Sequence, residues 1–299
     1  MTTTSPTPDR QHIQAVHAGT ARTHRPRIVA TDLDGTLLRS DGTISPRTQA
    51  ALEAAERAGL CIVFVTGRPP RWMDSVSDHI GGHGVAICSN GGAVYDVRRR
   101  MLLQSYPLRA DDALAVVERL RSALPGTTFA FEYPTGFSHE PEYPALMWDS
   151  EAVHRIAPAE ELLAAADGHS VFKVLARHPE LDPDIFLLKA REAAGELAEF
   201  TRSSSVALLE ISATGVSKAS TLARWCQERG ATAEDVVAFG DMPNDLPMLA
   251  WAGTAYAVAN AHPEVLAATG RHTARNDEDG VALIVEELLR ARIDGHPRN

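Results

Sequence analysis

The sequence predicts an α/β protein with a parallel-sheet core into which a second, α+β domain is inserted. Residues 27–68 read as strand, helix and strand, with apolar runs on either side of a helical pattern. Residues 95–212 instead mix half-buried strands with amphipathic helices. After residue 213 the alternation of apolar strands and helices returns. We therefore expect one Rossmann-like core that is split by the inserted domain.

The first strand–helix–strand unit carries clear boundary signals. Ile28 to Thr31 form a short apolar strand that a turn ends. Ser45 is a candidate helix N-cap with Pro46 at the first helical position, and Gly59 follows the last helical residue. The next run, LCIVFVTGR, is apolar on both faces, which indicates a parallel strand covered by helices on both sides.

The remaining segments complete the core and fill the inserted domain. A third apolar strand, GVAICSNGG, ends the first part of the core. The inserted domain should hold the helices ADDALAVVERLRSALPG and PDIFLLKAREAAGEL and the strands TTFAFEY, HSVFKVLAR and SVALLEIS. The core then resumes with SKASTLARWCQERG, DVVAFGD, NDLPMLAWAG, TAYAVA and DGVALIVEELLRARI. We expect a disordered tail over 1–26, the core over 27–94 and 213–299, and the inserted domain over 95–212.

Composition narrows the classes of partner. The formal net charge is −10 and the pI is about 5.6, which disfavours nucleic acid as a partner because its phosphates attract Lys and Arg. The three cysteines lack metal-site or disulfide spacing, and we expect buried free thiols in a cytoplasmic protein. Apolar runs are too short to span a membrane, and the N-terminus lacks the apolar region of a secretion signal. The oligomeric state stays open.

Polar residues stand where three predicted core strands end. Asp32 and Asp34 follow the first strand, Thr66-Gly67-Arg68 follow the second, and Asp241 follows a later one. Lys218 lies at the start of a predicted helix. Each has an ordinary explanation when taken singly: a turn, a strand-end hydroxyl or a solvated charge. Because ligands bind outside the carboxyl ends of parallel strands, their joint occurrence predicts a single site.

The motifs resemble those of a known family. DLDGTLL, FVTGR, GVSKAS and GDMPNDLPMLAWAG resemble the four motifs of the haloacid dehalogenase-like hydrolase superfamily. SNGGAVYD, AYAVANAHPEV and NDEDGVA resemble the Cof-type phosphatases within it, which carry a type IIB cap between the second and third motifs. The resemblance covers residues 27 to 290. Val258 departs from it, because a Met is more usual there.

The resemblance implies a role for each motif residue. Asp32 would be the nucleophile and form an aspartyl-phosphate, and Asp34 would protonate the leaving oxygen and then take a proton from water. Asp32, the backbone carbonyl of Asp34 and Asp241 would hold Mg²⁺, with Asp245 orienting either that shell or Lys218. The groups expected to hold the phosphate oxygens are Thr66, Lys218, Asn244 and the backbone amides of Leu33 and Gly67.

The implied function is a Mg²⁺-dependent phosphatase of small phosphorylated metabolites, with sugar phosphates favoured. The alternatives are a phosphomutase on the same core and a non-catalytic receiver-like module that is phosphorylated on Asp. The Asn90-Gly91 pair is interpreted as a hinge or as part of the site. Side chains of the inserted domain that could contact substrate are Tyr133, His139, Tyr143, Trp148, Lys173 and Arg202.

Overall fold

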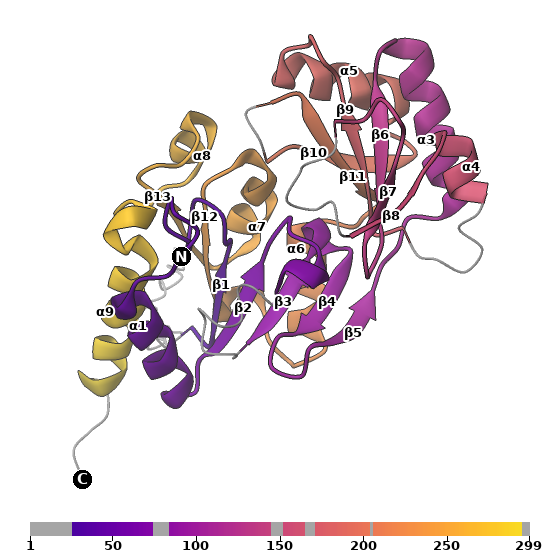
Figure 1. The fold of residues 1–299 in the computed structure, drawn as a ribbon. Helices are drawn as coiled ribbons and strands as arrows, with labels where there is room; N and C mark the ends of the chain where they lie inside the picture. The colour runs from indigo at the N-terminus through magenta and orange to yellow at the C-terminus, as the bar shows by residue number, and fades with distance from the viewer. Residues whose placement is uncertain (1–25, 74–83, 145–151, 165–170, 204–205, 295–299) are drawn as a thin grey trace, which may run out of the picture.

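Figure 1 shows the computed structural model, in which two sheets form two adjoining units. The structure describes residues 26–73, 84–144, 152–164, 171–203 and 206–294. An eight-stranded sheet, called the core sheet, carries both ends of the described chain. A six-stranded sheet, called the cap sheet, lies between its two halves in the sequence. The predicted α/β fold with an inserted α+β domain is confirmed.

The core sheet is parallel over most of its width. The pairs from β14 to β3 run parallel, and β4 and β5 are antiparallel additions at one edge. Its order is β14 (His272–Thr273), β13 (Thr254–Val258), β12 (Val236–Gly240), β1 (Ile28–Thr31), β2 (Cys61–Val65), β3 (Val85–Cys88), β4 (Ala93–Asp96) and β5 (Met101–Ser105).

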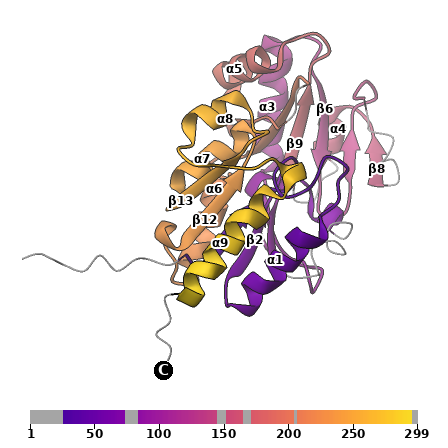
Figure 2. The ribbon, with the colours of Figure 1, turned by 90° about the vertical axis from the view of Figure 1, so that its left-hand side faces the viewer.

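Helices cover both faces of the core sheet, which explains why its strands are continuously apolar. Helices α1 (Pro46–Arg57) and α9 (Gly280–Asp294) lie side by side on one face, onto which Val29 points (Figure 2). Ala30 points to the opposite face, where α6 (Lys218–Gln227), α7 (Leu246–Trp251) and α8 (Pro263–Ala268) pack. Successive side chains thus enter two different cores. As predicted, α1 starts after the N-cap Ser45, whose side chain accepts the amide of Thr48.

The described helices of the cap lie on one face of the cap sheet. Its order is β10 (Ala198–Thr201), β11 (Leu208–Ala213), β9 (Lys173–Arg177), β6 (Thr128–Glu132), β7 (Phe137–His139) and β8 (Val153–Ile156). The pairs are antiparallel except β7 with β8. Helices α3 (Ala110–Ala123), α4 (Ala159–Ala164) and α5 (Pro183–Ala194) bury alternate strand residues such as Phe131 and Leu209. The intervening residues, Glu132 and Glu210 among them, belong to the opposite face.

Short 3₁₀ turns complete the chain. They are η1 (Pro70–Trp72), η2 (Ser89–Gly91), η4 (Ala233–Asp235), η5 (Pro243–Asp245) and η6 (Asn276–Glu278). Cys61, Cys88 and Cys226 are free thiols, and the last two are buried. Among the described residues, the helices are either too short or too polar to cross a lipid bilayer.

The strand pairing extends the core sheet to Ser105, beyond the residue 95 at which we expected the insertion to start. The short strand β5, MLLQS, carries three exposed apolar residues, and its pairing with β4 is a tertiary contact that local composition does not encode. The expected tail over 1–26 lies almost wholly outside the described residues. The division of the chain into separate folding domains stays a prediction.

Candidate active site

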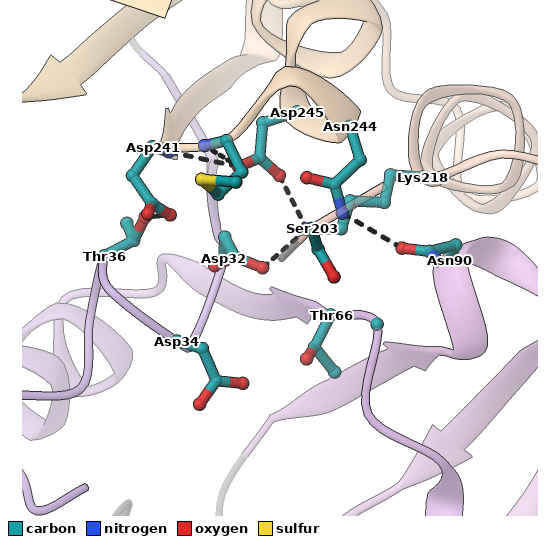
Figure 3. Close-up of polar contacts among 12 residues, drawn as sticks. Asp32, Asp34, Thr36, Thr66, Asn90, Ser203, Lys218, Asp241, Asn244 and Asp245 are labelled. Carbon is teal, nitrogen blue, oxygen red and sulfur yellow. Dashed lines mark hydrogen bonds and ion pairs between the residues drawn. The ribbon is translucent and has the colours of Figure 1, made fainter. Parts of the chain in front are cut away.

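The polar strand ends predicted from the sequence converge at one edge of the core sheet (Figure 3). Asp32 and Asp34 follow β1, Thr66 follows β2, and Asp241 follows β12. Since β1 lies between β2 and β12, the three strand ends are neighbours. Lys218 opens α6. A cavity of about 670 Å³ lies over this edge, and Asp32, Asp34, Gly67, Lys218 and Asn244 all line it.

Lys218 is held between two buried carboxylates. Its Nζ lies 2.5 Å from Asp32 Oδ1 and 2.6 Å from Asp245 Oδ1. The second oxygen of Asp245 accepts the backbone amides of Asp241 and Met242, both at 3.0 Å. Burial opposes the ammonium charge, but the two carboxylates outweigh it and raise the pKa of Lys218 above its ordinary value. Asp245 therefore fixes Lys218 to the β12 turn.

Three carboxylates crowd together beside this lysine. Asp32, Asp241 and Asp245 each place an oxygen within 4.8 Å of the others. Thr36 Oγ1 donates to Asp241 Oδ1 at 2.8 Å. Gly35 allows the approach: its φ is +77°, and a Cβ there would lie 2.5 Å from Asp241 Oδ2. A side chain at position 35 would thus displace Asp241.

The crowding disfavours negative charge on these acids. Burial, followed by the charge of Asp245, raises the pKa of Asp241 to about 6. Burial also raises the pKa of Asp32, and Asp245 and Asp241 add to this effect against the opposing charge of Lys218. Within the described residues that form this cluster, one lysine faces three acids. The site therefore has an excess of negative charge that a cation would relieve.

The donor set fits Mg²⁺, which binds carboxylate and other hard oxygen ligands. Both oxygens of Asp245 are already occupied by Lys218 and by backbone amides. Asp32 and Asp241 are the carboxylates that remain for a metal, and their role as its ligands stays a prediction. The roles of the Asp34 carbonyl as a ligand and of Asp245 as an orienting group stay predictions.

Asp34 makes a contact that the sequence did not reveal. Arg68 binds it through two nitrogens, with Nε at 2.7 Å from Oδ2 and Nη2 at 2.5 Å from Oδ1. The Asp34 side chain is 58% exposed, in contrast to buried Asp32. Arg68 belongs to the FVTGR motif, but its sequence position gave no sign of this pairing. A planar guanidinium fixes the direction in which Asp34 faces the cavity.

The predicted phosphate-binding groups occupy different depths. Gly67, Lys218 and Asn244 line the cavity, whereas Thr66 is buried and its hydroxyl accepts the amide of Arg68 at 3.0 Å. The carbonyl of Leu33 accepts amides of the following turn, and its side chain is buried. Their phosphate-binding roles stay predictions.

The open face of the cap sheet forms the opposite wall of the cavity. It contributes Lys173 and Tyr143, both anticipated, and also Glu132 and Glu210, which were not. Alternation within TFAFE and LLEIS is the signal that could have placed these acids away from the cap helices. The other candidates from the inserted domain are not among the residues that line the cavity. Tyr133 packs in the cap core, and His139 contacts the carbonyl of Glu140. Arg202 pairs with Asp184, and Trp148 lies outside the described residues.

Comparison with known proteins places these features in context. Residues 29–285 match a family model described as haloacid dehalogenase-like hydrolase. Pyridoxal phosphate phosphatase YbhA of Escherichia coli is 30% identical over 272 residues, covering 88% of this chain and 98% of that protein. An HMP-PP phosphatase of Yersinia enterocolitica is 30% identical over 244 residues, covering 80% and 86%.

Solved structures show the same architecture. A haloacid dehalogenase-like hydrolase from Bacteroides thetaiotaomicron aligns with a TM-score of 0.70 at 25% identity. The alignment covers 88% of this chain and all of that one, so both the core and the cap are shared.

We predict that Asp241→Asn stabilises the metal-free protein at pH 7 by about 1–3 kcal/mol, because it removes a carboxylate whose pKa is about 6 when folded and 3.8 ordinarily. Since the folded state holds the proton more tightly, the metal-free wild type should lose stability as pH rises from about 4 to about 6. Urea unfolding in EDTA at pH 4, 5, 6 and 7 measures both effects. The exposed Asp111→Asn is the control, and equal stability of Asp241→Asn and wild type at pH 7 would contradict the prediction.

Lys218→Met should destabilise the protein at pH 7 by about 3–5 kcal/mol, because it leaves Asp32 and Asp245 buried without their cation. The loss should shrink as the pH falls, because burial raises the pKa of Asp32 and its carboxyl group then takes up a proton. Equilibrium unfolding of Lys218→Met, of the double variant with Asp245→Asn, and of the exposed-site control Lys189→Met provides the test. The double variant should recover part of the loss, and a cost no greater than that of the control would show that the pair is not needed.

Proposed function

Because the chain belongs to the haloacid dehalogenase-like hydrolases, we propose that it is a Mg²⁺-dependent phosphatase that hydrolyses small phosphomonoesters through an aspartyl-phosphate on Asp32. The family assignment made from the motifs is confirmed. The observation that carries the proposal is the placement of Asp32. It is buried at the cavity floor, held by Lys218 at 2.5 Å, and beside Asp241. The two curated relatives at 30% identity are named phosphatases, which supports the same reaction class.

Asp32, Asp241 and the Asp34 carbonyl would hold Mg²⁺ in this proposal. When bound, the ion would offset the repulsion between the substrate dianion and the nucleophile. Lys218 adds a fixed positive charge at the same place, and Asp245 keeps it there. The Thr66 hydroxyl, the Asn244 amide and the backbone amides of Leu33 and Gly67 would take the phosphoryl oxygens.

The reaction has two steps. An oxygen of Asp32 attacks phosphorus in line, and the ester bond to the leaving oxygen breaks as Asp34 protonates it. Asp34 then takes a proton from a water molecule that attacks the aspartyl-phosphate, which releases inorganic phosphate and restores Asp32. Arg68 orients Asp34 at the cavity rim through both of its oxygens. The direction in which the Asp34 carboxyl group faces the leaving group is thus set by Arg68 of the β2 loop.

The substrate is a small phosphorylated metabolite in this proposal. A cavity of about 670 Å³ has room for such a leaving group. Sugar phosphates are the class that the sequence favours, and they head the substrate panel. A phosphomutase would use the same core but return the phosphoryl group to the substrate, so isomer formation without phosphate release would identify it. A phosphorylated receiver-like module would show neither. The cytoplasmic location stays a prediction.

We expect the purified protein to release inorganic phosphate from members of a panel of phosphomonoesters with Mg²⁺, and to lose this activity in EDTA. The panel should contain sugar phosphates, pyridoxal phosphate and p-nitrophenyl phosphate. Phosphate release is measured colorimetrically. Equal rates with Mg²⁺ and with EDTA would exclude the proposed metal dependence.

Asp32→Asn should abolish phosphate release, because an amide cannot form the aspartyl-phosphate, while its unfolding transition stays cooperative. Asp34→Asn should lower kcat by about 10²–10⁴-fold, which is the typical contribution of a general acid or base. Asp111→Asn, on the cap surface, is the matched control. Full activity of Asp32→Asn would refute the nucleophile assignment.

A further inference from the structure

The η2 turn between β3 and β4 is held in an unusual backbone conformation. Ser89, Asn90 and Gly91 all have positive φ, at 51°, 54° and 107°. Side chains disfavour this region, so two non-glycine residues there persist only when their surroundings fix them. Asn90 is buried, with 3% of its surface exposed. The contacts around Asn90 must therefore hold the turn in this conformation.

The backbone of η2 joins two site-bearing segments. The amide of Ser89 donates to the carbonyl of Arg68 at 2.9 Å, and that of Asn90 to the carbonyl of Thr66 at 3.0 Å. Thr221 Oγ1 in α6 donates to the carbonyl of Gly91 at 2.9 Å. A Cβ on Gly91 would lie 2.4 Å from the carbonyl oxygen of the α6 N-cap, Ser217. The turn therefore braces both the β2 loop and the helix that starts with Lys218.

The side chain of Asn90 connects the core to the cap. Its Oδ1 accepts from Asn244 Nδ2 at 3.2 Å, and its Nδ2 donates to Glu210 Oε2 at 2.8 Å (Figure 3 shows the first contact). Asn244 Oδ1 is buried and has no hydrogen-bond partner among the residues that the structure describes. One amide thus links a predicted phosphate-binding residue to a carboxylate of the cap sheet.

Glu210 is itself fixed by charge. Lys173 Nζ lies 2.7 Å from Glu210 Oε2, and both residues are about 95% buried. Burial opposes ionisation of Glu210, but Lys173 outweighs it and holds the pKa of Glu210 below its ordinary value. The same Lys173 nitrogen donates to the carbonyl of Gly67 at 2.8 Å. A Cβ on Gly67 would lie 3.2 Å from Glu210 Oε2, so the β2 loop rests against this pair.

We propose that Asn90 and Glu210 are positioning residues that couple the cap to the phosphate site of the core. Through its contact with Asn90, Glu210 fixes the orientation of the Asn244 side-chain amide. Through its contact with Lys173, it fixes the position of the backbone at Gly67. The cap therefore completes the phosphate-binding groups as well as covering them. The inference rests on the proposed phosphatase function and deepens it by adding residues that act through others.

An exposed ion pair of the cap provides the comparison. Glu161 of α4 pairs with Arg155 of β8 at 3.0 Å, and their side chains are 59% and 48% exposed. The described residues that line the cavity include neither of them. Loss of this pair removes a carboxylate from the cap, whereas loss of the Glu210 contacts should disturb the phosphate-binding groups.

The experiment measures inhibition by inorganic phosphate in the Mg²⁺-loaded full-length protein, together with kcat and KM for acetyl phosphate and pyridoxal phosphate. Acetyl phosphate is chosen because its leaving group is too small to need the cap wall. The variants are Asn90→Gly, Glu210→Gln and, as matched control, Glu161→Gln. Asn90→Gly removes the side-chain amide that bridges Glu210 and Asn244, and glycine adopts the positive φ without strain. An effect of this variant on phosphate binding is therefore due to the lost bridge and not to a distorted backbone.

We expect Asn90→Gly and Glu210→Gln to weaken phosphate inhibition by roughly tenfold and to lower kcat for both substrates, since misplaced binding groups cost rate whatever the leaving group. Glu161→Gln should leave phosphate inhibition at the wild-type value. Asn90→Gly should keep the wild-type melting temperature within a few degrees. Wild-type phosphate inhibition in both Asn90→Gly and Glu210→Gln would overturn the inference, and so would losses confined to pyridoxal phosphate. A wild-type protein that neither releases nor binds phosphate would instead overturn the proposed function, and the inference with it.

Discussion

The ammonium group of Lys218 between Asp32 and Asp245 is the contact on which the site depends. It spans three distant parts of the chain: the end of β1, the start of α6 and the turn after β12. Buried carboxylates gather at strand ends only where a cation or fixed amides balance them. The lysine and the amides of Asp241 and Met242 provide part of that balance. The negative charge that they leave uncompensated on Asp32 and Asp241 would be relieved by a bound cation.

The two sheets contribute to the site in different ways, because helices cover them differently. The central strands β12, β1 and β2 have helices on both faces, so their polar side chains stand where the strands end. The cap sheet has helices on one face, which leaves the other free to carry Glu132, Lys173 and Glu210 above those ends. The strand ends of the core sheet thus face the side of the cap sheet that its helices leave open. The cavity between them is walled by a rigid edge on one side and by paired charges on the other.

The sequence predicted the parts of this arrangement that local pattern encodes. Apolar runs marked β1, β2 and β12, the Ser45-Pro46 signal marked the start of α1, and strand-end polarity marked Asp32 and Asp241. It did not predict that Arg68 binds Asp34 through two nitrogens, because this contact depends on how the loops after β1 and β2 face one another. Nor did it assign β5 to the core, since the pairing with β4 is decided by tertiary contacts. For Glu210, alternation could give the face but not its partners in β9 and η2.

The strand order has a consequence for how the chain acquires its structure. The central strand β1 pairs with β2 soon after it in sequence, but its other neighbour is β12, which follows the entire cap. During synthesis, β1 would therefore wait with one open edge while the cap is made. Such non-local parallel pairing slows folding, because the chain loses the entropy of loop closure before the contacts between the strands stabilise it. Until β12 has been made, a nascent chain of this protein therefore exposes one edge of its central strand.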